Sequence, residues 1–430
     1  MIHVTRSKSI LSEVSFTMAS ISSVKSTLDS NEYQRPDEAN IEDKLDTAFD
    51  ELTSKSLKTR LRACEVIQCL LRENHLTEFI LSRSVTIRDT ITRCLKRQKG
   101  EDLGHVAIIA SLVCVSVGSE TFDTFSEIVS LISAVLIDHT AQTSIRIECA
   151  RSLSTCAFIT GDDNICIEAM HKLYSIFKAS GLKGDKKMPN IDEATSCLHC
   201  ACLEAWSLLL VALKNIKEQA RTAKESRAKV IELLDSSHLD LRQAAGETIA
   251  VIHELTVGHD DGMTYREFEE LCDKFNSLIS ESQKSRSKRE LKRQRASFRE
   301  IRNFFEDDLV PNAVVKFGQE TLVLNSWLKR CQYNALCDIL GAGINNHLAQ
   351  NKIVRDIFGL GEVVKQTFPQ RAKRSKEVSA IMRVVITLLI SCNKLTSLFQ
   401  HQHQHARVIA EKIQTKKMRG LRDKRAVIPD

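Results

Sequence analysis

Proline and glycine are scarce in this sequence, and their scarcity bears on the fold class. The 430 residues include five prolines and fifteen glycines. Strands joined by tight turns need more of both, because these residues supply the dihedral angles of turns. The composition therefore argues against an all-β fold and favours an all-α one.

The sequence also lacks a recognisable signal peptide and a long apolar run. Its first twenty residues interrupt every apolar stretch with Ser, Lys, Arg or Glu, and the run VVITLLI at 384–390 is too short to cross a bilayer. We therefore expect a cytoplasmic or nuclear protein whose fourteen cysteines are core residues or ligands rather than disulfide partners. The early Arg and Lys residues leave a mitochondrial transit peptide as an alternative.

Motifs of common enzyme classes are missing. The sequence contains no GxxxxGK[ST], GxSxG or HExxH, so it indicates no enzyme activity and no small-molecule substrate. Three stretches contain metal-binding residue types but no complete ligand set. CLHCAC (197–202) has no second ligand pair, HDDGMTYREFEEL (259–271) fits a calcium loop poorly, and HQHQH (401–405) reads as a solvated tract. We expect no metal and no cofactor.

A repeated pattern organises residues 41–283. In three places an Arg is followed by a small residue three positions later and by an aliphatic residue four positions after that. The copies are Arg60, Ala63, Ile67; Arg146, Cys149, Leu153; and Arg242, Ala245, Ile249. Gly104 with Ala107, and His199, Cys202 and Trp206, continue the register between them. The spacings of 86 and 96 residues, when halved, match armadillo and HEAT units, so we predict an armadillo-like α-solenoid. Generic helical packing is the alternative.

Positive charge is concentrated in two segments. Residues 284–302 have a net charge of +7 and residues 365–430 a net charge of +11, so the rest of the chain must be about −12 for the total to be +6. Such segregation suggests a scaffold that presents basic elements to a polyanion, either nucleic acid or an anionic membrane. The Ser-rich residues 1–40 are expected to be disordered.

The first basic segment is predicted to be an amphipathic helix over 284–303. Leu291, Phe298, Ile301 and Phe305 share one helical stripe, which we expect to pack against the segment that follows. The other faces hold five candidate nucleic-acid-binding residues: Lys288, Arg289, Lys292, Arg293 and Arg295. Residues 304–362 are predicted to form a small helical C-terminal domain, in which Leu324, Leu328, Cys331, Ala335 and Ile339 keep a helical period.

Several of these stretches resemble the interferon-related developmental regulator family. The resemblance rests on KRQRASFREI (292–301), on Lys316, Phe317, Gly318 and Glu320, on Trp327, Arg330, Gln332 and Tyr333, on Leu340, Gly341, Gly343, His347, Leu348 and Asn351, on RDIFGLG (355–361), and less distinctively on residues 45–71 and RDKRA (422–426). It implies a non-enzymatic protein with an armadillo-like N-terminal domain. Family members are described as factors that occupy translationally inactive ribosomes and as transcriptional co-regulators working with histone deacetylase corepressors.

The resemblance also implies a role for the tail, residues 363–430. The family's basic tail maps onto KKMRGLRDKRA, so six more nucleic-acid-binding residues are carried over: Lys416, Lys417, Arg419, Arg422, Lys424 and Arg425. Residues 382–405 have no family counterpart and are either an insertion or a gene-model error.

From these observations we predict a ribosome-binding repressor of translation that contacts rRNA. The first alternative is a nuclear co-regulator that recruits a histone deacetylase corepressor on the concave face of the solenoid. The second is membrane-surface binding, for which the tail has only a thin apolar face. We therefore expect no membrane partner.

Overall fold

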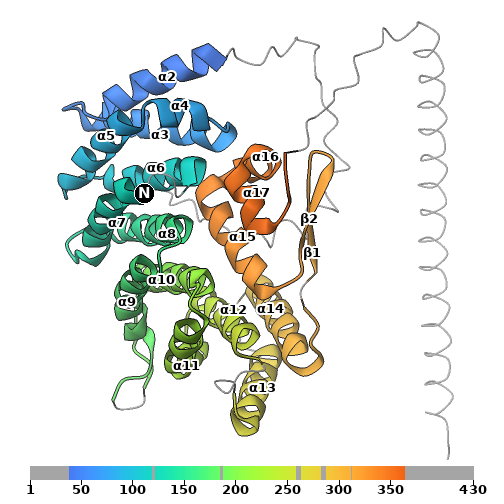
Figure 1. Cartoon of the computed structure of the whole chain (residues 1–430). Helices are drawn as coiled ribbons and strands as arrows, with labels where there is room; N and C mark the ends of the chain where they lie inside the picture. The colour runs from blue at the N-terminus through green and yellow to red at the C-terminus, as the bar shows by residue number, and fades with distance from the viewer. Residues whose placement is uncertain are drawn as a thin grey trace, which may run out of the picture. The chain divides into compact units, whose positions relative to one another are not determined.

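The computed structural model describes residues 38–118, 122–184, 187–257, 263–281, 287–310 and 312–363 (Figure 1). The first ten α-helices in the described part are α2 (Glu38–Glu51), α3 (Leu57–Glu73), α4 (Thr77–Ser82), α5 (Ser84–Lys96), α6 (Leu103–Val117), α7 (Phe122–Ile137), α8 (Thr143–Thr160), α9 (Asp163–Phe177), α10 (Glu193–Ala212) and α11 (Ile216–Glu232). They are followed by α12 (Leu239–Thr256), α13 (Tyr265–Ser280), α14 (Lys288–Asp307), β1 (Ala313–Phe317), β2 (Glu320–Leu324), α15 (Trp327–Leu340), α16 (Ile344–Gln350) and α17 (Lys352–Phe358), and short 3-10 turns η2 (Lys178–Ser180), η3 (Leu233–Asp235) and η4 (Gly341–Gly343) complete the order.

The helices from α2 to α13 stack in sequence order, which confirms the predicted solenoid. Helix α3 packs on α6, α6 on α8, α8 on α10 and α10 on α12, so these five form one continuous layer (Figure 1). Helices α5, α7, α9 and α11 each pair with a member of that layer. Each unit thus buries its apolar face against its neighbours, as repeat architectures require.

The repeat pattern found in the sequence falls on this layer, one copy per helix. Its small and aliphatic residues on α3, α8 and α12 are all completely buried. Its arginines bind near helix ends: the Arg60 Nε donates to Asp102 Oδ2 at 2.8 Å, and the Arg146 Nε donates to the Leu136 carbonyl at 2.8 Å. Small residues permit close helix approach, since a Cβ on Gly104 would lie 3.3 Å from the Cα of Ile145. The repeated sequence pattern therefore marks the residues that pack neighbouring helices of the layer against each other.

Two helices of this layer are apolar on almost every side. Nearly all residues of α6 are buried, and so is most of α10. Among the described helices, α10 has the length and composition that could cross a membrane, but two thirds of its best 18-residue window is buried inside the protein. A helix that is apolar all round is expected in the interior of a large fold, and that is where α10 lies.

The segment 304–362 is not wholly helical as predicted, because a β-hairpin follows the last turn of α14. Strands β1 and β2 pair antiparallel, with Phe317 opposite Glu320 across a two-residue turn. Gly318 in this turn has φ +55°, a left-handed conformation that glycine adopts without strain. Leu324, which was assigned to a helical period, is the last residue of β2, and α15 starts only at Trp327.

The elements after the hairpin pack against the repeat layer. Helix α15 contacts α6, α8, α10 and α12 in turn, and the residues after it reach back to α3. The Arg72 Nε donates to the Ile339 carbonyl at 2.8 Å, and the Asn351 side chain donates to the Val115 carbonyl at 3.0 Å. At Gly343 the chains are so close that an added Cβ would lie 1.8 Å from the Arg72 carbonyl oxygen. The boundaries 41–283, 284–303 and 304–362 stay predictions, but these segments pack as one compact unit that ends at Val363.

A buried arginine joins the hairpin to the last helix. Arg355 on α17 is completely buried, and its Nη1 and Nη2 donate to the two carboxylate oxygens of Glu320 at 2.9 and 2.8 Å. It also donates to the carbonyls of Leu348, Leu360, Gly361 and Glu362 at 2.9 to 3.0 Å. Its five N–H groups therefore have six acceptors, and the side chain ties three stretches of chain together.

Candidate nucleic-acid interface

Helix α14 is the described element with the predicted basic face. A capping box starts it: the Ser287 hydroxyl accepts from the Glu290 N–H, and the Glu290 carboxylate accepts from the Ser287 N–H. The helix runs for 20 residues to Asp307 and is capped by Asp308, whose φ is +51°. The reciprocal cap satisfies donors that the first turn would otherwise leave without partners. The predicted helix over 284–303 is thus present, shifted by four residues at each end.

The apolar face of α14 is docked, as expected, but its neighbours are not those expected. Phe298 and Ile301 are completely buried, and Leu291 is only half-buried. The Phe298 ring stacks on Phe275 of α13 with centroids 6.0 Å apart, and the main contacts of α14 are with α12 and α13. Of the segment after the hairpin, Trp327 approaches Phe304 at 6.1 Å. The prediction that the stripe packs mainly on that segment is therefore wrong.

A polar cluster fixes the rotation of α14 about its axis. Gln294 is 1% exposed, accepts from the Arg242 Nη2, and donates to the Leu278 carbonyl at 2.7 Å and to Glu281 at 2.8 Å. Arg242 also pairs with Glu281 at 3.2 Å. Because a buried polar group is costly to leave unpaired, this cluster holds the opposite face of the helix toward solvent.

Three of the five predicted basic residues of α14 are exposed. These are Lys288, Arg289 and Lys292. The remaining two are half-buried and contact the protein itself: Arg293 pairs with Asp240, and the Arg295 Nη2 donates to the Glu281 carbonyl at 3.0 Å. The predicted cluster is therefore brought together on one helix, with Lys288, Arg289 and Lys292 as its exposed members.

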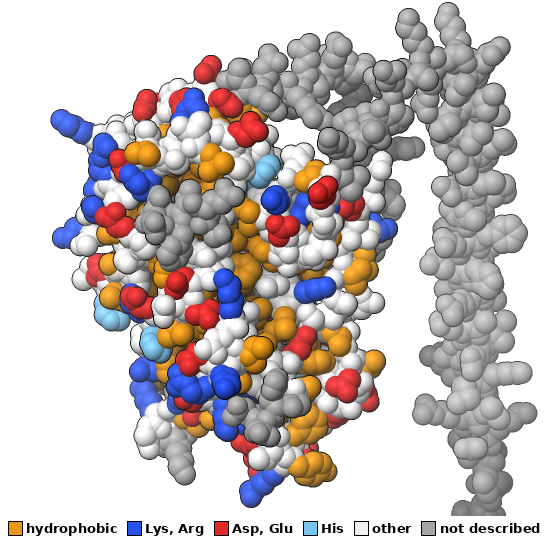
Figure 2. All heavy atoms as spheres, in the orientation of Figure 1, with side chains coloured by type: hydrophobic (Ala, Val, Ile, Leu, Met, Phe, Trp, Pro, Cys, Tyr) orange, Lys and Arg blue, Asp and Glu red, His pale blue; other side chains and the backbone are white. Residues whose placement is uncertain are grey.

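The sequence reasoning missed other exposed cations. Arg299 on α14 is exposed and lies seven residues after Lys292, on the same side of the helix. Helix α11 presents Lys217, Arg221 and Lys224, and basic side chains gather over this region in Figure 2. Arg221 is ion-paired to two glutamates of its own helix, which lowers the net charge there. Both sets could have been recognised in the sequence, because their basic residues are three, four or seven positions apart, which places them on one face of a helix.

The six predicted tail residues, Lys416 to Arg425, lie outside the residues that the structure describes. The same holds for HQHQH and for most of the segment 1–40, of which only Glu38 onward, the start of α2, is described. What the sequence predicts for these residues therefore stays a prediction.

The metal-like stretches are ordinary helix in the described part. His199 on α10 is buried and hydrogen-bonded to the Ser180 hydroxyl, and burial lowers the pKa of His199 to about 4. Cys200 and Cys202 are buried too, and burial raises the pKa of both thiols well above the usual range. Thr264 starts α13 with a capping box, although residues 258–262 before it are not described. Within the described ranges, no group of three or more His, Cys, Asp or Glu side chains is placed to hold a metal.

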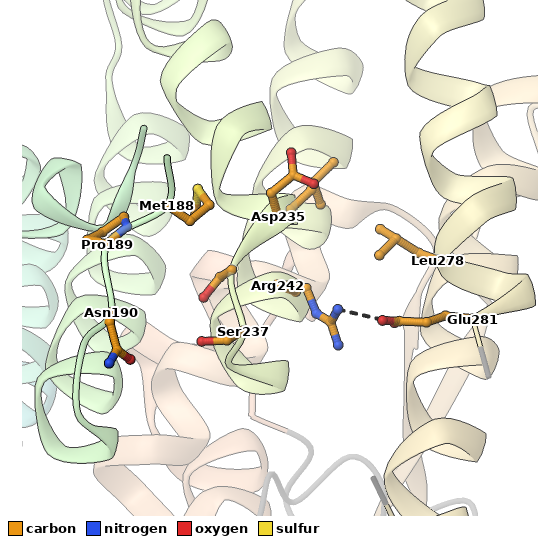
Figure 3. A pocket seen from close by; sticks show the side chains of 10 residues that line it. Met188, Pro189, Asn190, Asp235, Ser237, Arg242, Leu278 and Glu281 are labelled. Atoms are coloured by element: carbon orange, nitrogen blue, oxygen red, sulfur yellow. Dashed lines mark hydrogen bonds and ion pairs between the residues drawn. The ribbon is translucent and has the colours of Figure 1, made fainter. Parts of the chain in front are cut away.

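A polar cavity of about 510 Å³ adjoins α14 (Figure 3). Its lining residues come from the loop before α10, from η3 and the loop after it, from the first turn of α12 and from the end of α13. They are Met188, Pro189, Asn190, Leu234, Asp235, Ser236, Ser237, Arg242, Leu278 and Glu281. Arg242 and Glu281 are the residues that also bind Gln294, so the cavity wall and the basic helix share one hydrogen-bond cluster.

Comparison with known proteins places these features in a family context. The sequence model of the interferon-related developmental regulator family matches residues 13–306, which include the repeat helices and almost all of α14. Interferon-related developmental regulator 2 of Mus musculus is 33% identical over 334 residues, 77% of this chain and 76% of that protein. Interferon-related developmental regulator 1 of Homo sapiens is 31% identical over 327 residues, 75% of this chain and 72% of that protein. The protein of the same name from Sus scrofa is 32% identical over 327 residues, with the same coverage.

Proposed function

Because the chain belongs to the interferon-related developmental regulator family, we propose that it is a non-enzymatic ribosome-binding protein that represses translation by occupying inactive ribosomes. Its partner would be ribosomal RNA, and its place of action the cytoplasm. The observation that supports this proposal is the cationic outer face of α14: a helix held rigidly by its buried side that turns Lys288, Arg289, Lys292 and Arg299 to solvent.

The chemistry of this face suits an RNA backbone. Lysine and arginine side chains that neutralise phosphates release counterions, which makes binding strong at low salt and sequence-independent. Base stacking would need exposed aromatic rings, but Phe298, Phe304 and Phe305 of α14 are all buried. We therefore expect α14 to contact phosphates and not bases.

The test is a ribosome pelleting assay over a salt series, comparing the full chain with a triple variant in which Lys288, Arg289 and Lys292 are changed to alanine. If each contacts one phosphate, the slope of log K against log salt should become shallower by about 2 to 3. A matched control replaces three exposed cations of α3 and α5, Lys58, Arg62 and Arg93, by alanine. Equal slopes for the native chain and the α14 variant would contradict the proposal for this helix.

The tail is a second, separable part of the proposal. A chain that ends at Gln404 lacks the six basic residues of the KKMRGLRDKRA stretch. If these six contact phosphates, the full chain should show a slope about 4 to 5 units steeper than the shortened chain. Equal affinity and equal slope would show that the tail does not carry the binding.

The nuclear co-regulator reading remains the alternative, in which the basic segments are import signals and the concave face binds a corepressor. Helix α15 and the residues after it contact α3, α6, α8, α10 and α12, and so occupy one side of the layer that a partner would otherwise use. Exclusive recovery in the nuclear fraction, without ribosome association, would favour this alternative.

A further inference from the structure

The β-hairpin is a two-stranded sheet that has no third strand in the described part of the chain (Figure 1). Successive residues of a strand point to opposite faces of a sheet. On the face toward the protein, Phe317, Leu322 and Leu324 are buried. The side chains of the other face are exposed, and they are Val314, Lys316, Thr321 and Val323. One face of the hairpin is therefore open to solvent.

The same four residues also direct backbone groups away from the hairpin. A two-residue turn is closed by a hydrogen-bonded pair, here Phe317 and Glu320, and hydrogen-bonded and non-hydrogen-bonded pairs alternate along an antiparallel ladder. The N–H and C=O groups of the alternate pairs, Val314 with Val323 and Lys316 with Thr321, therefore point outward. Among the described residues, none of these outward groups has a hydrogen-bond partner.

The two edges of the hairpin differ in how they are protected. Strand β1 carries Lys316, and a lysine on an edge strand is a common device against pairing with another chain. Strand β1 also contacts α16. Strand β2 instead exposes Thr321 and Val323, both β-branched, and has no lysine, proline or bulge. The edge of β2 is therefore the one that can accept a further strand.

The outward backbone groups select the kind of partner. Thr321 and Val323 each offer an N–H and a C=O, which an extended polypeptide matches residue by residue. A helix cannot match them, because its own backbone groups are paired internally. A second copy of β2 fits less well than another sequence. The antiparallel pairing of two copies that uses both residues sets Val323 opposite Thr321, so neither valine gains an apolar neighbour across the new edge.

We propose that the edge of β2 binds an extended segment of another protein as a third, antiparallel strand. The segment carries an apolar β-branched residue opposite Val323 and, two residues later, a glutamate opposite Thr321. The apolar residue continues the column of Val314, which is 50% exposed, and Val323, which is 41% exposed. The glutamate complements Lys316, whose long side chain can extend across the shorter Thr321. This inference goes beyond the proposed ribosome binding and does not depend on it.

The probe is a fluorescein-labelled peptide, STVTETS, whose valine and glutamate have the required spacing, and fluorescence anisotropy measures its binding to the full chain. We expect a Kd below about 1 mM, since four main-chain hydrogen bonds and one apolar pair form. N-methylation of the peptide valine, whose N–H faces β2, should weaken binding at least about tenfold. N-methylation of the threonine between valine and glutamate is the matched control, because that N–H points away from β2.

Two variants of the chain locate the site. Thr321→Pro removes an outward N–H and leaves the ladder intact, since proline is tolerated where a strand N–H faces solvent, and it should weaken peptide binding at least about tenfold. The matched Val314→Pro removes the equivalent N–H of β1 and should leave binding within about twofold. Val323→Lys places a charge in the apolar column and should weaken binding without removing a backbone donor. Urea denaturation midpoints check that each variant is folded.

Three results would overturn the inference. The first is the absence of saturable binding. The second is binding that survives both Thr321→Pro and Val323→Lys, or that N-methylation of either peptide position weakens equally. The third is sedimentation of the full chain as a dimer that Thr321→Pro dissociates, because a second copy would then occupy the edge. Hydrogen exchange gives the supporting result: added peptide should slow the amides of Thr321 and Val323 and leave that of Lys316 unchanged.

Discussion

Replacing Arg355 by methionine should destabilise the protein more than most single substitutions. The methionine keeps an unbranched apolar stem of similar length but removes all five donors. Glu320, whose side chain is 26% exposed, then loses both of its bonds to the guanidinium, and the buried Leu348 carbonyl loses its donor from Arg355.

The size of the effect follows from what is left without a partner. Removing one member of a fully buried ion pair typically costs about 3 to 5 kcal/mol. Glu320 is 26% exposed and can be partly rehydrated, so its lost bonds cost less, and the buried Leu348 carbonyl adds about 1 to 3 kcal/mol as an acceptor without a donor. The carbonyls of Leu360, Gly361 and Glu362 lie near the surface and can turn to water, so we add nothing for them. We therefore expect the free energy of unfolding to fall by about 2 to 4 kcal/mol. The loss in Arg355→Lys should be smaller than in Arg355→Met but still measurable, because lysine keeps the positive charge. Lysine cannot form the planar bidentate bond that arginine makes to the carboxylate.

Urea denaturation measures the total loss, and hydrogen exchange locates it. The amides of β2 and α17 should lose protection first, because Arg355 joins these two elements. The double variant Arg355→Met with Glu320→Gln should lose less than the sum of the two single changes, since it removes both charges. A loss below about 1 kcal/mol in Arg355→Met, with β2 and α17 still protected, would refute the reasoning.

Three further predictions concern the docking of the C-terminal elements. Phe298→Ala should cost about 3 to 5 kcal/mol in urea denaturation, because its completely buried ring would leave a cavity; a cost under 1 kcal/mol would mean that α14 is not docked by its stripe. Gly343→Ala should expose the α3 amides around Arg72 to rapid hydrogen exchange, because the new methyl group would overlap the Arg72 carbonyl, and unchanged exchange there would contradict this close contact. The hydrogen bonds from Arg355 lower the pKa of Glu320, so its contribution to stability is present above about pH 4.3 and is lost as the pH falls through the lower folded value. The stability difference between the native chain and Glu320→Gln should therefore shrink from pH 7 to pH 3 in urea titrations, and a constant difference would argue against the ion pair.

The repeat layer could be predicted from the sequence because its signal is local. Arg, small and aliphatic residues recur at fixed spacing, and each helix has to bury the same kind of face against the next. Helical periodicity likewise identified the buried side of α14 from Phe298 and Ile301. Periodicity could not predict that α12 and α13 are the elements that pack on this face. An apolar stripe indicates that a helix face is buried, but not which element buries it.

The hairpin was missed for a different reason. Leu324 and Leu328 are four residues apart, which imitates a helical period, although one is in a strand and the other in a helix. The sequence signal that could have found it was a pair of short runs rich in β-branched and apolar residues, AVVKF and ETLVL, on either side of Gly318. The contact of Arg355 with Glu320 could not be found by any local pattern, because 35 residues separate the two. The cavity is lined by four segments that are likewise separated in the sequence, so no local pattern could predict it.

The return of the C-terminal segment to the first repeats has a consequence for how the chain is made and how it melts. In an ordinary repeat array each unit touches only its neighbours, so the ends can unravel independently. Here Arg72 binds the carbonyl of Ile339, 267 residues later, and Asn351 binds that of Val115, 236 residues earlier. During synthesis the early repeats leave the ribosome with one side uncovered, and stay so until almost all of the described chain has been translated. Once α15 to α17 are in place, the first repeat cannot open without breaking contacts with the last helices, which makes a linear stack behave as a single cooperative unit.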